Sequence, residues 1–293
     1  MVRIDPILHS MASQNREKLN ALLQRLPEGL VVDSGWMERE GYSSSLRSQY
    51  VAAGWLVQPA RGVFMRPLGR LTWQKAVISL QTLLEYPVIV GGGTALALQG
   101  YAHYLDGGQR ETVHLHGLYP PPGWLTRLPL DADFVFHRIA SLFDGASCAQ
   151  SANSFKWGSE ENEASLPEIA RAGILHEKFS GSEWPLAVSR PERAFLELLD
   201  ELPSRESFDN ADMIAQGLQN LRPGLMQRLL EDCRSIKVKR LCFWLAERHG
   251  HGWLRHIDRT KISLGSGKRM LAKGGRLDPT YLITVPEDLD EPV

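Results

Sequence analysis

A run of three glycines is the clearest candidate for phosphate chemistry in this 293-residue chain. Gly91, Gly92 and Gly93 follow the apolar triplet Val88–Val90 and precede Thr94 and an apolar stretch with helical spacing. Glycine lets the backbone of such a strand-to-helix turn approach a ligand closely, and the N–H groups at a helix start can bind phosphate oxygens. The alternative is a structural turn, in which the glycines only allow the strand and the helix to pack closely.

The carboxylates that phosphate transfer would need are poorly placed for this turn. Nucleotidyltransferases follow a strand with Gly-Gly-[Ser/Thr] and a helix, and carry two carboxylates one residue apart on the next strand, where both bind one metal pair. The nearest such pair, Asp131 and Asp133, begins 38 residues beyond Gly93, whereas these enzymes have a gap on the order of ten. Closer to the turn stands the single Asp106. We therefore favour the structural turn and predict no catalytic residue and no enzyme activity. The alternative is a nucleotidyltransferase that uses Gly91–Gly93, Asp131 and Asp133.

Two groups of residues could ligate a metal. The first is Cys233, Cys242, His249 and His251. If 233–249 is mostly helical, the two sulfurs lie roughly 13 Å apart, too far for one tetrahedral zinc. In the second group, His114 and His116 share one face of a predicted strand. Metal binding there would recruit His103 or His137, but hydrogen-bonded imidazoles in a partly buried strand are the favoured interpretation. We predict neither a metal nor a cofactor.

A third candidate is a short polar helix face suited to nucleic acid. In the predicted helix from Ser43 to about Ala53, Ser44, Arg47 and Ser48 share one face, while Leu46, Tyr50 and Ala53 share the other. Solvated helix faces usually carry long Glu and Lys side chains. Small hydroxyls beside one arginine instead suit close approach to base edges and phosphates.

The elements around this face predict how it is positioned. An amphipathic helix from Ser13 to Leu26 precedes a short helix that Asp33 can cap, with Trp36 and Met37 inward. Gly41 ends that helix, and a turn leads to the polar one. Gly54 ends the polar helix, after which Trp55 and Leu56 are expected to return to the core. A strand from Val57, a turn over Pro59–Gly62 and a return over Val63–Met65 form a hairpin. The order is that of a winged helix-turn-helix domain. The predicted DNA contacts are Ser43, Ser44, Arg47, Ser48, Gln58, Arg61 and Arg66.

The same stretch resembles the amino-terminal winged domain of the AbiEi antitoxins, the regulators of type IV toxin–antitoxin operons. The resemblance is carried by Arg16-Glu17-Lys18-Leu19 through Leu26-Pro27, Gly41-Tyr42-Ser43, Gly54-Trp55-Leu56 and Arg61-Gly62-Val63-Phe64. It implies a repressor of its own operon, with a carboxy-terminal domain that counteracts a nucleotidyltransferase-like toxin. The expected partners are that toxin and operator DNA with inverted repeats, bound by two copies of a monomer or weak dimer.

The rest of the chain predicts a larger mixed α/β domain, so that the fold class is α+β. Residues 1–66 form the reader domain, 67–71 a linker, and 72–293 the second domain. Thr72 can cap the first helix of this second domain, and Ser189 a later one that begins with Pro191. Short strands are expected at 88–90, 112–116, 133–137 and 186–188, helices at about 209–220, 223–234 and 236–249, and a last strand at 281–285.

Charge is unevenly distributed although the net charge is only −1. Residues 1–75 hold ten Lys or Arg against six Asp or Glu, and 222–276 hold fourteen against four. The basic region 222–276 has three interpretations: a solvated helical face, auxiliary phosphate contacts, or a docking face for an acidic partner such as the toxin. The candidate contacts are Lys237, Lys239 and Arg240.

Composition narrows the remaining classes of protein to which the chain could belong. The three cysteines, Cys148, Cys233 and Cys242, form no paired framework, which is typical of reduced thiols. No signal sequence and no apolar run long enough for a membrane span are present, so we predict a cytoplasmic protein without membrane partners. A regulator that responds to a metabolite is the third function class, although no residue of the sequence indicates a ligand.

Overall fold

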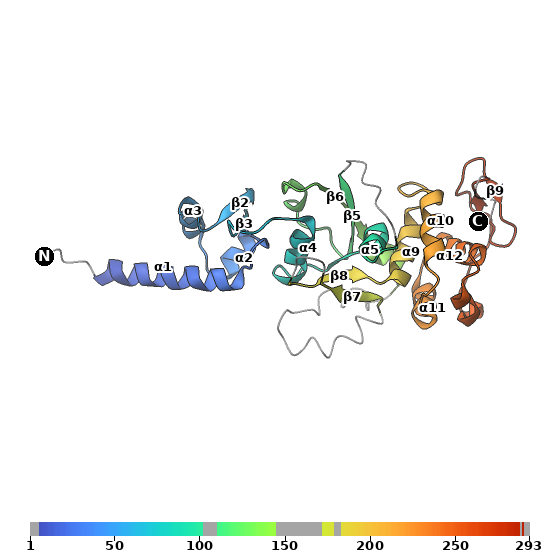
Figure 1. The fold of residues 1–293 in the computed structure, drawn as a ribbon, viewed down its shortest axis with the longest axis horizontal. Helices are drawn as coiled ribbons and strands as arrows, with labels where there is room; N and C mark the ends of the chain where they lie inside the picture. Colours follow the sequence, from blue (N-terminus) through green and yellow to red (C-terminus); the bar gives the residue numbers. More distant parts are fainter. Residues whose placement is uncertain (1–5, 102–109, 145–171, 179–182, 288, 290–293) are drawn as a thin grey trace. The chain divides into compact units, whose positions relative to one another are not determined.

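The structure is a computed structural model that describes residues 6–101, 110–144, 172–178, 183–287 and 289. Its contacts divide the chain into two compact units (Figure 1). The first unit comprises Met1–Leu84 and Pro122–Asp131, and the second comprises Glu85–Pro121 and Ala132–Val293. Among the described residues, no helix combines the length and the apolar character that crossing a bilayer demands.

The first unit follows the order helix, strand, two helices, hairpin, helix. A 3₁₀ turn, Leu125–Arg127, joins it from the 122–131 segment. The other elements are α1 (Pro6–Arg25), β1 (Val31–Asp33), α2 (Ser34–Arg39), α3 (Ser44–Ala52), β2 (Val57–Ala60), β3 (Val63–Met65) and α4 (Trp73–Thr82). Figure 1 shows α2, α3 and the β2–β3 hairpin grouped beside α1. Two short helices followed by a hairpin are thus present in the chain order that the sequence indicated.

Side-chain caps and a small apolar core fix this unit. Asp33 accepts the Trp36 N–H at 2.8 Å and Ser43 accepts the Leu46 N–H at 3.3 Å, so both predicted caps are confirmed. Strand β3 pairs antiparallel with β1 on one side and with β2 on the other, which gives the order β1-β3-β2. The predicted inward side chains Trp36 and Met37 are buried.

Several predictions for this unit were wrong. Helix α1 begins at Pro6 rather than at Ser13, because proline is favourable in a first helical turn. Strand β1 was missed, since three residues show no periodicity. Trp55 is 48% exposed instead of returning to the core, which Leu56 alone does. The contact division places the predicted linker 67–71 inside the first unit, because α4 packs on β1 and its Ser79 hydroxyl accepts the Val31 N–H at 2.9 Å.

The second unit is built on a five-stranded mixed sheet of order β6-β5-β4-β8-β7. Its strands are β4 (Val88–Val90), β5 (Glu111–Gly117), β6 (Ala132–Arg138), β7 (Ile174–Glu177) and β8 (Leu186–Ser189). Its helices are α5 (Gly92–Leu98), α6 (Ile139–Leu142), α9 (Pro191–Glu201), α10 (Phe208–Gly217), α11 (Pro223–Asp232) and α12 (Ile236–Arg248). Beyond them lie the 3₁₀ turns Gly252–His256 and Arg259–Lys261 and a small pair of strands, β9 (Arg276–Leu277) and β10 (Thr284–Val285).

Helix α9 is the centre of this unit. It packs against α5 on the sheet side and against α10, α11 and α12 on the other, so almost every position along it is buried. Pro191 stands in its first turn as predicted, but Ser189 is the last residue of β8, and Arg190 occupies the cap position. The mixed α/β fold with a helical end is therefore confirmed, with β7 and β9 as strands that the sequence did not indicate.

Candidate nucleic-acid interface

A groove of about 460 Å³ lies between α3 and the β2–β3 hairpin of the first unit. One wall is the outward face of α3 and the other is the hairpin. Five of the seven predicted DNA contacts line it, together with Ser34, Gly62, Phe64, Val51 and Ala52. The five are Ser44, Arg47, Ser48, Gln58 and Arg61. The structure therefore places residues from two elements on one surface that the sequence could only assign separately.

The rim of the groove is polar and exposed. Ser44 and Ser48 lie on successive turns of α3, and the Ser48 hydroxyl donates to the Ser44 carbonyl at 3.0 Å. Arg61 stands at the hairpin tip, where Ala60 pairs with Val63 and Gly62 adopts a φ of +77° that a side chain would strain. The short hydroxyls of α3 let another molecule approach the helix closely, while the hairpin tip places the cation Arg61 beside it.

Arg47 is held in place at the floor of the groove. Its guanidinium donates to the carbonyl oxygens of Ser34 at 3.0 Å and Tyr42 at 3.2 Å, and it lies 6.0 Å from the centre of the Phe64 ring. It therefore links the start of α2, the turn before α3 and the hairpin. A cation fixed in this way loses little side-chain entropy when an anion binds, so the groove is preorganised for one.

The two remaining predicted contacts have structural partners. The Ser43 hydroxyl caps α3, which places it at the helix start and not on the groove wall. Arg66, at the base of the hairpin, pairs with Glu28 at 3.0 Å and donates to the Leu23 carbonyl at 3.4 Å. These bonds tie the hairpin to α1. Arg66 is thus anchored inward. Its place in the sequence, as a basic residue near a predicted turn, does not reveal this.

The candidate contacts of the basic carboxy-terminal region are turned inward as well. Lys239 and Arg240 are buried, at 6% and 2% exposure. The Arg240 guanidinium donates to the carbonyl oxygens of Leu264 and Gly267 at 2.8 and 2.7 Å, and Lys237 donates to those of Asp200 and Leu202. The three interpretations of the basic region stay predictions, but Arg240 and Lys237 already have carbonyl partners within the chain, since irregular backbone needs donors for its carbonyl groups.

In the second unit, the triple-glycine turn binds a carboxylate of the chain itself. The Gly92 N–H donates to Glu197 Oε2 at 3.0 Å, and Arg193 Nε donates to Oε1 at 2.7 Å. Burial by itself would raise the pKa of the Glu197 carboxyl, but His116, Arg193 and the Gly92 N–H together lower it below its usual range. Glu197 therefore occupies the N–H group that the nucleotidyltransferase alternative assigns to a triphosphate.

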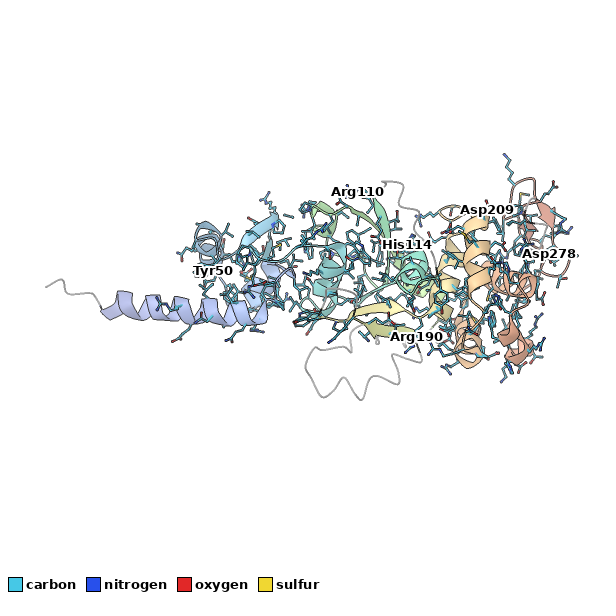
Figure 2. All side chains as sticks on the ribbon, viewed as in Figure 1. Tyr50, Arg110, His114, Arg190, Asp209 and Asp278 are labelled. Carbon is cyan, nitrogen blue, oxygen red and sulfur yellow. The ribbon has the colours of Figure 1, made fainter. Side chains whose placement is uncertain are left out.

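The acids of that alternative do not join the turn. Asp131 is exposed just before β6, and Asp133 near the start of β6 pairs with Arg110 at 3.4 Å, both side chains being more than half exposed. The positions on the next strand that face the turn are instead His114 and His116 of β5: a Cβ added at Gly91 would lie 2.4 Å from the His116 ring. Figure 2 labels His114 near α5.

The imidazoles of β5 and β6 form a cluster with two acids of α9. His114 Nδ1 lies 2.9 Å from His137 Nε2, and His137 Nδ1 lies 3.1 Å from Glu201 Oε1. Burial lowers the pKa of His116 to about 3, and burial with the neighbouring His137 lowers that of His114 to about 4. His103 lies outside the described residues. Sequence reasoning missed Glu197 and Glu201, although acids one turn apart on an otherwise apolar helix face were the available signal.

The cysteine-containing group does not assemble. Burial raises the pKa of the Cys233 thiol to about 11, while His249 Nε2 contacts Asp212 at 2.8 Å. Among the described residues, the His, Cys, Asp and Glu side chains close enough to share one ion are His114, His137 and Glu201.

Comparisons with known proteins decide the family of this chain. The model of the AbiEi antitoxin N-terminal domain, a transcriptional regulator, matches residues 15–107, and the model of the AbiEi antitoxin and transcriptional regulator of type IV toxin–antitoxin systems matches residues 110–286. This chain belongs to the AbiEi antitoxin family. AbiEi proteins are transcriptional regulators of type IV systems, as the resemblance of the amino-terminal stretch had implied.

A solved structure shares the fold of this AbiEi-family chain. It is the crystal structure of the RV2827C protein from Mycobacterium tuberculosis, with a TM-score of 0.53 and 16% sequence identity over 90% of this chain and 88% of that one. At this identity the likeness shows the fold alone, and it extends over both units. None of the curated proteins compared with the chain matches it.

Proposed function

We propose that this AbiEi-family protein represses its own toxin–antitoxin operon by inserting α3 into the major groove of operator DNA, and that it counteracts a nucleotidyltransferase-like toxin. The observation that supports the DNA-binding half is the groove between α3 and the hairpin, lined by Ser44, Arg47, Ser48, Gln58 and Arg61. In a winged domain these are the two elements that contact DNA, and here they share one polar, cationic surface.

The residues divide into base-facing and backbone-facing roles. Ser44 and Ser48, short and exposed on α3, allow the helix to approach base edges, and Gln58 adds an amide at the hairpin side. Arg61 at the hairpin tip contacts phosphate or the adjacent minor groove. Arg47, fixed by two carbonyl oxygens, faces the same surface and serves both the fold and DNA binding. One such surface makes few contacts, so repression uses two copies on an inverted repeat.

The test is a mobility-shift titration of the full-length protein on the DNA upstream of its own gene. Arg61→Ala should weaken binding to operator and unrelated DNA alike and reduce the slope of log K against log salt by about 0.9, as expected for one lost phosphate contact. Ser48→Glu, which adds an anion to the exposed face of α3, should weaken binding by roughly tenfold or more.

The matched control is Arg66→Ala, which removes a cation from the same hairpin at its inward-facing base. Its affinity for operator should stay within roughly twofold of wild type, with an unchanged salt slope. Equal losses in the Arg61 and Arg66 variants would show that total charge and not this groove governs binding. Unchanged affinity in both Arg61→Ala and Ser48→Glu would overturn the proposed interface.

The antitoxic half is carried by the family membership, and it is tested separately in the full chain. The Ser48→Glu protein should still restore growth when expressed from an independent promoter together with the toxin of the adjacent gene, because antitoxicity is assigned to the second unit. Growth arrest by that toxin despite soluble, folded Ser48→Glu protein would reject this assignment. Growth arrest despite wild-type protein would reject the antitoxin function for this pair of genes.

A further inference from the structure

The histidine cluster of the second unit has a donor set and a geometry that the proposed function does not use. In the register of the parallel strands β5 and β6, His116 stands opposite His137, and His114 lies two residues earlier on the same face. Helix α9 crosses this face with Glu197 and Glu201 one turn apart. Three imidazoles and two carboxylates from three elements therefore meet.

These five groups separate into a closed inner pair and a more open outer trio. Glu197 is fully buried and committed to Arg193 and the Gly92 N–H, with His116 Nδ1 3.8 Å away. In the outer trio, His114 and His137 are partly exposed and Glu201 is buried: the side chains of His137 and Glu201 are 12% and 9% exposed. The two histidines of the outer trio are therefore the more exposed members of the cluster.

The outer trio has the spacing of a metal site. One ligand atom from each of His114, His137 and Glu201 lies within 4.8 Å of the others. In a tetrahedral zinc site with bonds of 2.0–2.1 Å, neighbouring ligand atoms are roughly 3.3 Å apart. His114 Nδ1 and His137 Nε2 are 2.9 Å apart, so a small adjustment of these two rings would admit an ion between them. Glu201 Oε1 lies 3.1 Å from the other nitrogen of His137, Nδ1, so the carboxylate must also turn towards the ion for all three residues to bind it.

The surroundings limit how these rings can move. The His116 ring stacks on that of His137 with centroids 4.6 Å apart and an interplanar angle of 20°. The His114 and His137 rings lie at 12° to each other, and their facing nitrogens are within hydrogen-bond distance. Arg205 holds Glu201 from the far side at 3.4 Å. Ligands fixed by such neighbours lose little entropy on metal binding.

We propose that His114, His137 and Glu201 form a site for a borderline transition-metal ion, Zn²⁺ being the best fit. Two imidazoles and one carboxylate suit Zn²⁺, Co²⁺ or Ni²⁺ and disfavour Mg²⁺ or Ca²⁺, which take oxygen ligands. Three protein ligands leave the fourth position of a tetrahedral ion for water. The site joins β5 and β6 to α9, so its occupancy stabilises the centre of the second unit.

The experiment titrates Co²⁺, a spectroscopic substitute for Zn²⁺, into full-length metal-free protein. We expect one equivalent to bind with the intense visible ligand-field bands of a tetrahedral site, to be displaced by Zn²⁺, and to resist Mg²⁺. Zn²⁺ should also slow hydrogen exchange in β5, β6 and α9 of the wild type. Wild-type protein that shows no tetrahedral Co²⁺ spectrum and no such protection would overturn the proposal, with no variant needed.

Variants then locate the site. His137→Gln and Glu201→Gln should each weaken Co²⁺ binding at least tenfold, with circular dichroism confirming that they fold. His176→Asn, which alters another partly buried strand histidine of the same unit, is the matched control and should bind like wild type. Sulfur-to-cobalt charge-transfer bands would assign the ion to a cysteine and overturn the proposal. So would unchanged affinity in both Gln variants.

Discussion

The two compact units use their arginines in opposite ways. In the first unit, Arg61 extends from the hairpin tip and Arg47 lines a groove while binding two backbone carbonyls. In the second, Arg193 is completely buried against Glu197, and Arg240 is 2% exposed among carbonyl oxygens. The same residue type therefore lines an open groove in one unit and binds acceptors of the chain itself in the other.

This difference shows why a count of charges along the sequence misjudges a binding surface. The surplus of basic residues is larger in 222–276 than in 1–75. Yet many cations of 222–276 have internal partners: Arg222 pairs with Glu192, Arg248 with Asp212, and Arg259 with Glu247. The modest surplus of the first unit includes Arg47 and Arg61, which line a groove, and cations on an open groove attract an anion more strongly than cations already paired with carboxylates.

The largest effect that would test this contrast is expected from Arg193→Met. It leaves the buried Glu197 carboxylate with the Gly92 N–H but without its cation, so the free energy of unfolding of the second unit should fall by about 3–5 kcal/mol. Urea denaturation of the full-length protein, followed by hydrogen exchange in α9, measures the loss.

The control for that measurement is Arg47→Met in the first unit. It removes two hydrogen bonds to partly exposed carbonyl oxygens, and the expected cost is about 1–2 kcal/mol. Adding Glu197→Gln to Arg193→Met should recover part of the stability, since no uncompensated charge then remains buried. If Arg193→Met costs no more than Arg47→Met, the two units do not differ in the way described.

Lowering the pH should destabilise the second unit relative to the first, by less than Arg193→Met does. Burial lowers the pKa of His176 in β7 to about 4, against 6.5 when the chain is unfolded. Between these values the unfolded chain binds a proton that the folded one does not, so stability is complete above pH 6.5 and falls as the pH drops towards 4. From pH 7 to pH 5 the second unit should lose about 2 kcal/mol through His176.

Hydrogen exchange measured at both pH values checks this, with peptides of the first unit as the internal reference, because the only histidine of 1–84 and 122–131 is His9. His176→Asn should remove that part of the pH dependence. A pH profile unchanged by this substitution would show that His176 takes up its proton in the folded state.

Sequence reasoning predicted the first unit well where local rules decide the structure. Asp33 and Ser43 were recognised as caps because a capping side chain needs only its own backbone neighbours. Gly41 and Gly54 ended helices with positive φ values of +81° and +75°, as glycine allows. Gly41, Ser43 and Gly54 also belong to the motifs that carry the family resemblance.

Prediction failed where a partner distant in sequence decides the outcome. Arg66 turns inward because Glu28 and Leu23 of another segment meet it, and Glu197 reaches Gly92 across 105 positions. The residues of the outer trio come from β5, β6 and α9, so no spacing within one element predicts that they meet. The Arg240 guanidinium likewise binds carbonyl oxygens of the irregular segment after α12.

The smallest effect concerns how the two units start their key helices. Helix α3 begins at a side-chain cap, the Ser43 hydroxyl that accepts the Leu46 N–H, whereas α9 begins with Pro191 and, within the described residues, no side-chain cap bond. Ser43→Ala should therefore destabilise α3 by about 1 kcal/mol, visible as faster hydrogen exchange in 44–52. DNA affinity should fall only slightly, since Ser43 lies at the helix start and not on the groove wall.

Ser43→Asp retains a capping oxygen and should restore the protection. A loss of protection that Ser43→Asp leaves unrepaired would show that the hydroxyl acts through something other than the cap, and a large loss of DNA affinity in Ser43→Ala would move Ser43 back among the direct contacts.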